Sequence, residues 1–235
     1  MNDPKIIVAL DFDDLQSVKH LIKQLNPSLC RLKIGKELFT SFGPQIVDLV
    51  QSQGFEVFLD LKFHDIPVTT AKACKAAANL GVWMVNVHAL GGPAMLAAAR
   101  EAIDASHSQT KLIAVTILTS INQSEINKIG IQDDIDTQVN RLATLAFDAA
   151  LDGVVCSAQE TEGLRKKFGD QFLLVTPGIR PAGVALNDQK RAVTPVDAIE
   201  NGSSYLVIGR PITQAENPLK VLTDINESIK NKLRK

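Results

Sequence analysis

Three charged side chains, Asp60, Lys62 and Asp65, stand within six residues of one another, directly after an apolar segment. Alternate side chains of a strand share a face, so Asp60 and Lys62 are expected to point the same way, whereas Asp65 lies past the strand end. Residues 57–59 are of the kind that parallel sheets bury on both faces. Charge clusters at the ends of buried strands tend to be functional, which favours a site over ordinary surface ion pairs.

Other charged candidates also follow apolar segments of strand length, namely Asp11, Lys33, Arg180 and Arg210. If the segments are neighbouring strands, then Asp11, Lys33, Asp60 and Lys62 form an alternating set of carboxylates and ammonium groups. In such a set every ammonium has a carboxylate neighbour that keeps it charged. The chemistry is therefore expected to collect at the carboxyl ends of the strands.

The two last loops of this kind are rich in glycine and contain Gly178, Gly183, Gly202 and Gly209. Glycines can serve turns alone, but they also let backbone N–H groups approach an anion, and Arg210 adds a two-pronged donor. Barrel enzymes commonly bind phosphate at this position. The long loop 176–193, which carries Arg180 and Gln189, is a candidate lid beside that phosphate site.

The strands that must position these residues are predicted at 5–11, 29–35, 56–61, 82–88, 111–118, 153–156, 172–176 and 204–208. Helical segments are expected after every strand but the seventh, with one helix through Phe39 to Val50, another from Pro67, and the last from about Pro218. Eight strand-then-helix units with continuously apolar strands predict a (β/α)8 TIM barrel, here as a single α/β domain over residues 1–235. The competing doubly wound sheet lacks its GxGxxG fingerprint after the first strand.

Composition excludes several classes of function. The chain has 25 basic and 26 acidic residues and no basic block before its last six residues, so we expect no nucleic-acid or membrane partner. Its three cysteines are far apart, and no HExxH pattern occurs, so we expect no disulfide framework and no metal site. No leader or membrane-length apolar run is present, which predicts a cytoplasmic location.

Polar residues on other segments give weaker signals. His88 would share a strand face with Asn86 and Met84, where a histidine is expected to be a hydrogen-bonded interior group rather than a base. Ser120 has no nearby histidine to activate it, so we expect a polar contact with substrate rather than a nucleophile.

Nearly the whole chain resembles the orotidine 5′-phosphate decarboxylase family in its bacterial form. The resemblance rests on the stretches ALDFDD, LKIGKELF, DLKFHDIP, VNVHALGG, LTS, TPGIRP, DQKR and VIGRPIT, in that order. The chain departs from the family pattern at Val68, where asparagine is usual, and at Ser204, where an aspartate is common. The resemblance implies a homodimeric decarboxylase that converts orotidine 5′-monophosphate to UMP and CO2, the last step of pyrimidine synthesis, without cofactor or metal.

The resemblance also implies roles for individual residues. Lys62 would be the proton donor, in a charged network completed by Lys33, Asp60 and Asp65. Asp65 and Thr69 would be offered to the active site of the other subunit. The residues implied to bind substrate are Asp11, Lys33, Asp60 and Thr69 around the ribose and the reacting carbon, Ser120 and Gln189 at the pyrimidine or its neighbouring phosphate loop, and Arg180, Gly209 and Arg210 at the phosphate.

Two alternatives remain. A magnesium-dependent phosphosugar decarboxylase or aldolase of the same barrel superfamily also carries a DxKxxD pattern, but it usually places glutamate on the second strand, where this chain has Lys33. A non-catalytic barrel that binds a phosphorylated ligand would need no lysine between carboxylates, and Lys62 argues against it.

Overall fold

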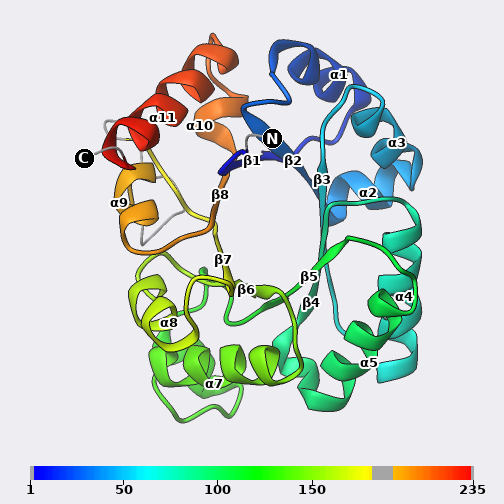
Figure 1. Ribbon diagram of the computed structural model, residues 1–235, viewed down its shortest axis with the longest axis vertical. Coiled ribbons are helices and arrows are strands. Elements are labelled where there is room, and N and C mark those ends of the chain that lie inside the picture. Colours follow the sequence, from blue (N-terminus) through cyan, green and yellow to red (C-terminus); the bar gives the residue numbers. More distant parts are fainter. Residues whose placement is uncertain (1–2, 182–192, 234–235) are drawn as a thin grey trace.

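Eight parallel strands close into a barrel in the order β1-β2-β3-β4-β5-β6-β7-β8, with β1 paired to both β2 and β8 (Figure 1). This computed structural model describes residues 3–181 and 193–233 of the chain. The strands are β1 Ile6–Leu10, β2 Cys30–Gly35, β3 Val57–Phe63, β4 Met84–His88, β5 Lys111–Val115, β6 Gly153–Val155, β7 Leu173–Thr176 and β8 Tyr205–Ile208. The predicted TIM barrel is confirmed, with strand ends shifted by at most three residues.

Helices surround the barrel, as Figure 1 shows. They are α1 Leu15–Gln24, α2 Lys36–Phe42, α3 Gln45–Gln51, α4 Pro67–Asn79, α5 Gly92–Asp104, α6 Gln123–Lys128, α7 Ile135–Asp148, α8 Thr161–Phe168, α9 Pro195–Glu200, α10 Arg210–Thr213 and α11 Pro218–Leu233, with a 3-10 turn at Ala89–Gly91. The single helix predicted through residues 39–50 is wrong, because Gly43 at φ 64° ends α2 and Pro44 cannot continue it. Helices α9 and α10 were not predicted, since six and four residues are too few to show a helical period.

Both faces of the strands are buried, which explains their continuous apolar sequence. Outward side chains pack under the helices, while a separate interior cluster consists of Ile7, Ala9, Phe58, Met84, Ile113, Val175, Tyr205 and Val207. The strand register sets Lys33 beside Ala9 on one side and Phe58 on the other. Asp60 pairs with Gly35, one step nearer the carboxyl ends. The charged residues therefore lie directly above the apolar interior cluster, on the side of the carboxyl ends of the strands.

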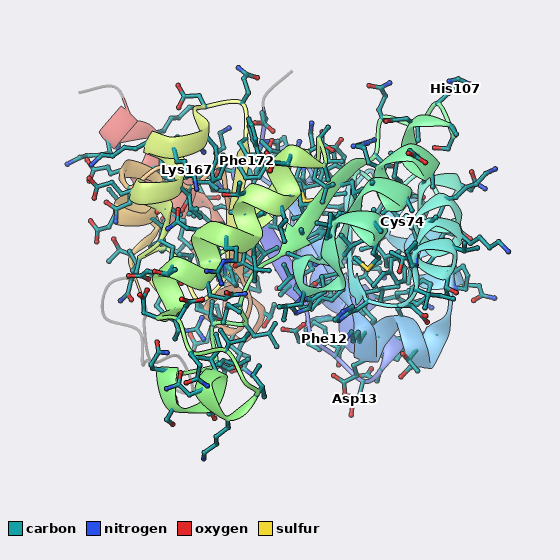
Figure 2. The ribbon with its side chains drawn as sticks, turned by 90° about the horizontal axis from the view of Figure 1, so that it is seen from below. Phe12, Asp13, Cys74, His107, Lys167 and Phe172 are labelled. Atoms are coloured by element: carbon teal, nitrogen blue, oxygen red, sulfur yellow. The ribbon has the colours of Figure 1, made fainter. Side chains whose placement is uncertain are left out.

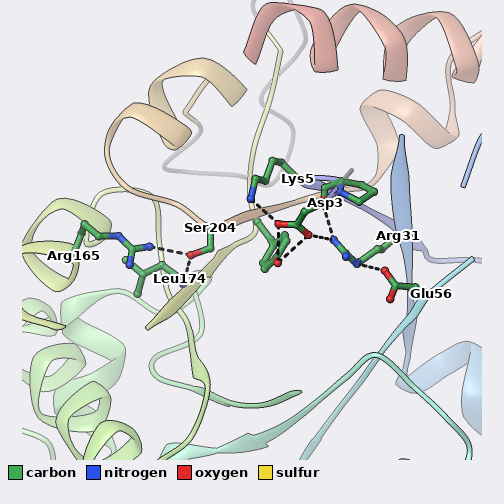
Figure 3. Close-up of polar contacts among 9 residues, drawn as sticks. Asp3, Lys5, Arg31, Glu56, Arg165, Leu174 and Ser204 are labelled. Carbon is green, nitrogen blue, oxygen red and sulfur yellow. Dashed lines mark hydrogen bonds and ion pairs between the residues drawn. The ribbon is translucent and has the colours of Figure 1, made fainter. Parts of the chain in front are cut away.

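Arg31 organises a polar cluster at the amino-terminal end of the barrel (Figure 3). Its guanidinium donates to Glu56 at 2.8 Å and to Asp3 at 2.9 Å, and it lies 3.9 Å from the centre of the Trp83 ring. The Tyr205 hydroxyl also donates to Asp3, and burial together with that carboxylate raises the pKa of Tyr205 to about 12. This cluster fills the end of the barrel opposite to the charged residues of β2 and β3.

Ser204, where the resemblance led us to expect aspartate, has a defined partner set. Its hydroxyl accepts hydrogen bonds from Arg165 at 2.9 Å and from the N–H of Leu174 at 3.0 Å (Figure 3). Asp152, which precedes β6 two units earlier, does the same and accepts from Arg100 and from the N–H of Leu112. In both cases the residue just before a strand connects the preceding strand to the helix that leads into that preceding strand. The hydroxyl of Ser204 keeps this link without a buried carboxylate.

A side view separates the two ends of the barrel (Figure 2). Phe12 and Asp13, which follow β1, lie at one edge, and His107, which precedes β5, lies at the opposite edge. Cys30, Cys74 and Cys156 are buried free thiols. Among residues 3–181 and 193–233, no helix is both long and apolar enough to cross a membrane.

Candidate active site

A chain of four alternating charges crosses the carboxyl end of the barrel. The Lys62 ammonium lies 2.6 Å from one oxygen of Asp60, and the other oxygen lies 3.4 Å from the ammonium of Lys33. Lys33 in turn reaches Asp11 at 3.2 Å. The residues come from β3, β2 and the turn after β1, so the predicted alternation of carboxylates and ammonium groups is present. Gly35 leaves room for it, since a Cβ there would lie 3.3 Å from the Lys33 nitrogen.

Asp60 is the buried centre of this chain, with 8% of the residue exposed. Burial alone would raise its pKa, but the charges of Lys33 and Lys62 and the hydrogen bonds from Lys62 and Asn86 outweigh burial and hold the pKa below its ordinary value. Asp60 is therefore ionised at neutral pH. A fixed negative charge lies directly beside the Lys62 ammonium.

A cavity of about 210 Å³ opens beside these charges. Lys33, Asp60 and Lys62 form its charged wall, and Ser120, which the sequence predicted to contact substrate, is among the residues that line it. The remaining lining is mostly apolar and comprises Phe58, Val115, Ile117, Leu118, Thr119, Val155, Pro177 and Val207. A cavity with one charged wall and apolar surroundings suits a flat ring that carries a negative group on one edge.

Asn86 is the functional residue that sequence reasoning missed. Its side-chain amide donates to Asp60 at 2.7 Å, and its carbonyl oxygen accepts the backbone N–H of Lys62 at 2.8 Å. The sequence showed only an amide in the apolar strand MVNVH, on the same face as Met84. A fully buried amide at an interior register position needs partners, and that requirement was the available signal.

His88 does not fit the prediction of a hydrogen-bonded interior group. Its ring stacks on that of His64 with the centroids 5.3 Å apart, and its buried Nδ1 has no hydrogen-bond partner within the described part of the chain. The prediction is wrong because β4 ends at this residue, and its ring meets another ring rather than a polar group. Burial, the neighbouring His64 ring and the charges of Lys36 and Lys62 lower the pKa of His88 to about 4, so His88 is neutral at pH 7.

This lowered pKa predicts a loss of stability in mild acid. As the pH falls through the ordinary value of 6.5, His88 gains a proton in the unfolded chain but not in the folded one until about pH 4. The free energy of unfolding should therefore decrease between about pH 6.5 and pH 4. Urea unfolding at several pH values measures this slope, and His88→Asn should reduce it. His20→Gln, an exposed histidine on α1, is the control, and an equal reduction there would contradict the assignment.

Several predicted residues lie outside the cavity lining, and Asp65 and Thr69 are two of them. Asp65 and Thr69 are exposed where β3 leads into α4. One oxygen of Asp65 accepts the N–H of Ile66 at 2.6 Å, and its carboxylate makes no ion pair with any other described residue. Within a single chain, Asp65 is therefore not part of the charge network that the sequence assigned to it.

The predicted phosphate residues follow β7 and β8. Arg180 is buried and donates to the carbonyl of Ile179 at 3.0 Å, and Arg210 begins the short helix α10. A Cβ on Gly209 would lie 3.7 Å from an oxygen of Asp11, so the β8 end adjoins the charge chain. None of the three lines the cavity itself. Gln189 and Gly183, and most of the loop predicted as a lid, lie outside the described residues.

Metal ligation was not expected from the sequence. Within residues 3–181 and 193–233, no group of three or more His, Cys, Asp or Glu side chains is placed to hold a metal ion.

The fold and site define a (β/α)8 barrel protein with a lysine-carboxylate centre at the carboxyl ends of its strands. Residues 4–225 match the model of the "Orotidine 5'-phosphate decarboxylase / HUMPS family", and the chain belongs to that family. It is 58% identical to the orotidine 5′-phosphate decarboxylase of Nitrosospira multiformis, covering 98% of this chain and 96% of that one. With the Vibrio cholerae enzyme of the same name it shares 57% identity over 97% of this chain and all of the relative.

Solved structures agree with this family. The crystal structure of orotidine 5′-phosphate decarboxylase from Lactobacillus acidophilus superposes with a TM-score of 0.86 at 39% identity, covering 97% of this chain and 99% of that one. The enzyme of the same name from Pyrococcus horikoshii, at 21% identity and a TM-score of 0.78, shares the fold.

Proposed function

We propose that the protein is a carboxy-lyase that converts orotidine 5′-monophosphate to UMP and CO2, the final step of pyrimidine biosynthesis. The observation that carries the proposal is the Lys62 ammonium, held 2.6 Å from the buried Asp60 on the wall of the cavity. The curated relatives at 57–58% identity bear the name of this enzyme. The family description joins two names, so the relatives rather than the family model favour this reaction over that of a phosphosugar enzyme.

Lys62 would act twice in the reaction. When the bond from the pyrimidine ring to the carboxylate breaks, CO2 leaves and the electron pair stays on the ring carbon. No carbonyl is positioned to delocalise that pair, so an adjacent ammonium must stabilise it and then donate the proton that completes UMP. Lys62 has the position and the charge for both tasks, and Lys33 together with Asp60 would hold it in place.

Asp60 would lie beside the carboxylate of the substrate. Its pKa is held below the ordinary value, so it is ionised, and two negative groups would face each other before the reaction. Loss of CO2 relieves this repulsion. The same carboxylate then faces only the lysines that support the carbanion.

The phosphate of the substrate would bind between the loops after β7 and β8. Arg210 and Gly209 stand at the carboxyl end of β8, and Arg180 follows β7. Enzymes lower activation barriers by about 8–23 kcal/mol, and one ammonium group alone cannot supply that much. Binding energy from the remote phosphate can therefore be used to organise the charged centre. Asp11 and Ser120 would contact the ribose and the pyrimidine, and Gln189 would join from the loop.

Arg210→Ala should lower kcat/KM for orotidine 5′-monophosphate by roughly 30- to 1,000-fold. This corresponds to about 2–4 kcal/mol for the loss of a charge-assisted contact with phosphate. Steady-state kinetics on both variants measure the change, with Lys166→Ala, an exposed cation on α8, as the control. An unchanged kcat/KM in the Arg210 variant would place the phosphate elsewhere.

We also propose that the active unit is a homodimer. Three large apolar side chains near Asp65 are exposed, Ile66 by 66%, Val68 by 61% and Leu90 by 40%. They adjoin a surface hollow lined by His64, Asp65, Ile66, Pro67, Leu90 and Gly91. Exposed apolar side chains gathered in one patch beside polar groups are typical of protein interfaces. A two-fold interface here would bring Asp65 and Thr69 of each chain to the site of the other.

The remaining parts of the proposal come from the sequence. Residues 1–235 would form one catalytic domain, working in the cytoplasm without a cofactor or metal. Val68, which replaces the usual asparagine, would serve this interface through its exposed apolar side chain.

A single assay tests the proposed function. Purified protein is mixed with orotidine 5′-monophosphate and EDTA, and the loss of substrate absorbance in the ultraviolet is followed. Turnover that EDTA does not affect is the expected result. Turnover that requires added magnesium would favour the related phosphosugar enzymes, and substrate binding without turnover would favour a non-catalytic barrel.

A further inference from the structure

We infer that Asn86 is a positioning residue that holds the backbone of Lys62 in a strained conformation and so aims the lysine ammonium. The kinetic consequence of this inference rests on the proposed function, while its structural part does not. Asn86 forms hydrogen bonds with Asp60 and with the backbone N–H of Lys62. It would influence the reaction only by positioning these two residues.

The strain lies at Lys62 itself. Lys62 has φ 51°, in the left-handed region that side chains other than glycine seldom adopt. A backbone in this region persists only where its surroundings enforce it. The conformation turns the strand at the residue that carries the ammonium.

The pairing of β3 with β4 is interrupted at the same point. Leu59 pairs with Val85 and Phe63 pairs with Val87, so residues 60–62 of β3 face only Asn86 of β4, three residues against one. A bulge of this kind leaves backbone groups without ladder partners. The side-chain oxygen of Asn86 accepts the N–H of Lys62 at 2.8 Å and takes the place of the missing partner.

The nitrogen of the Asn86 amide holds the Asp60 carboxylate, which is the counter-ion of Lys62. This nitrogen donates at 2.7 Å to the Asp60 oxygen that also binds the Lys62 ammonium at 2.6 Å. Asn86 is fully buried, so water does not replace these contacts. One side chain with a donor and an acceptor therefore holds both the backbone and the counter-ion of the lysine. An apolar residue of similar size could do neither.

The backbone part is tested by thermal melting of four variants. Lys62→Gly and Lys62→Ala are compared in the wild-type background and again in the Asn86→Ala background. With Asn86 present, the glycine variant should melt about 2–4 °C above the alanine variant, because glycine adopts positive φ without strain. Without Asn86 the backbone can relax, and the glycine advantage should vanish or reverse. An equal advantage in both backgrounds would overturn the inference.

The catalytic part is tested by kinetics on Asn86→Ala. Because the ribose and phosphate contacts remain, kcat should fall by about 100-fold or more while KM changes little, as expected for a misplaced reacting group. Thr110→Val is the matched control, since it removes a buried 2.7 Å hydrogen bond to Val82 at the other end of the barrel and should leave kcat unchanged. A kcat loss in Asn86→Ala no larger than in this control would overturn the inference.

The melting test and the kinetic test distinguish a failure of this inference from a failure of the proposed function. If the wild-type protein does not decarboxylate orotidine 5′-monophosphate, the proposed function fails, but the melting comparison still decides what Asn86 does to the backbone. If Asn86→Ala does not fold, Asn86→Ser serves in both tests, because its shorter hydroxyl reaches neither partner but leaves a smaller void. Wild-type kcat in a folded Asn86→Ser variant would likewise overturn the positioning role.

Discussion

Lys62→Ala is expected to lower kcat for orotidine 5′-monophosphate by about 10⁴-fold or more, the largest effect of any single substitution in this chain. General acid catalysis contributes about 10²–10⁴-fold, and removal of a group that stabilises charge in the transition state about 10²–10³-fold. Lys62 would supply both contributions. Its ammonium lies 2.6 Å from Asp60, in a place that no other described lysine except Lys33 approaches.

The fold should survive this substitution. Lys62 stands at the carboxyl end of β3, where its side chain is partly exposed, and the apolar core below it is untouched. Binding of UMP, which depends on the phosphate loops, should be nearly unchanged. Turnover and UMP affinity are measured on protein purified from a host that lacks its own decarboxylase. Lys220→Ala, which removes an exposed cation on α11, should keep full activity. Appreciable turnover by Lys62→Ala under these conditions would contradict the assignment of Lys62 as the proton donor.

The barrel and the charge chain could be read from the sequence because both depend on local pattern. Each strand is buried on two faces and is therefore continuously apolar, as in Ile6–Leu10, and the turn or helix after it begins at a clear signal such as Pro67. Parallel strands bring their carboxyl ends to one edge, so charges placed at those ends must meet. Asp11, Lys33, Asp60 and Lys62 meet for this reason alone.

What the sequence could not provide depends on contacts between strands. The left-handed backbone of Lys62 follows from the three-against-one bulge between β3 and β4, and no local signal in either strand marks that mismatch. The role of Asn86 follows from the same bulge. The ring of His88 stacks on that of His64 instead of contacting a polar group. This contact depends on the position of the loop after β3, which the sequence of β4 does not indicate. The break between α2 and α3 was the exception, because Gly43 and Pro44 signalled it.

A second large effect is expected from mixing two inactive variants, and it follows from the position of Asp65. The Asp65 carboxylate is exposed beyond the end of β3, off the register that joins Asp60 and Lys62, and it makes no ion pair with the described residues of its own chain. The exposed apolar residues Ile66 and Val68 follow it directly in the chain. A carboxylate among exposed apolar groups would face a partner subunit across a two-fold interface, so each chain would complete the site of the other.

Lys62→Ala and Asp65→Ala chains, each inactive as a homodimer, should regain activity when they are unfolded together and refolded. In the heterodimer one site lacks both groups, while the other combines Lys62 of one chain with Asp65 of its partner and is intact. Random pairing gives half heterodimers, each with one native site of two, so the mixture should recover about a quarter of wild-type activity. The control pairs Lys62→Ala with Asp60→Ala. Both of those residues belong to the same chain's site, so no heterodimer has an intact site and activity should stay absent. If the Lys62 and Asp65 mixture stays as inactive as its parents despite verified heterodimers, Asp65 acts within its own chain and the shared site is wrong.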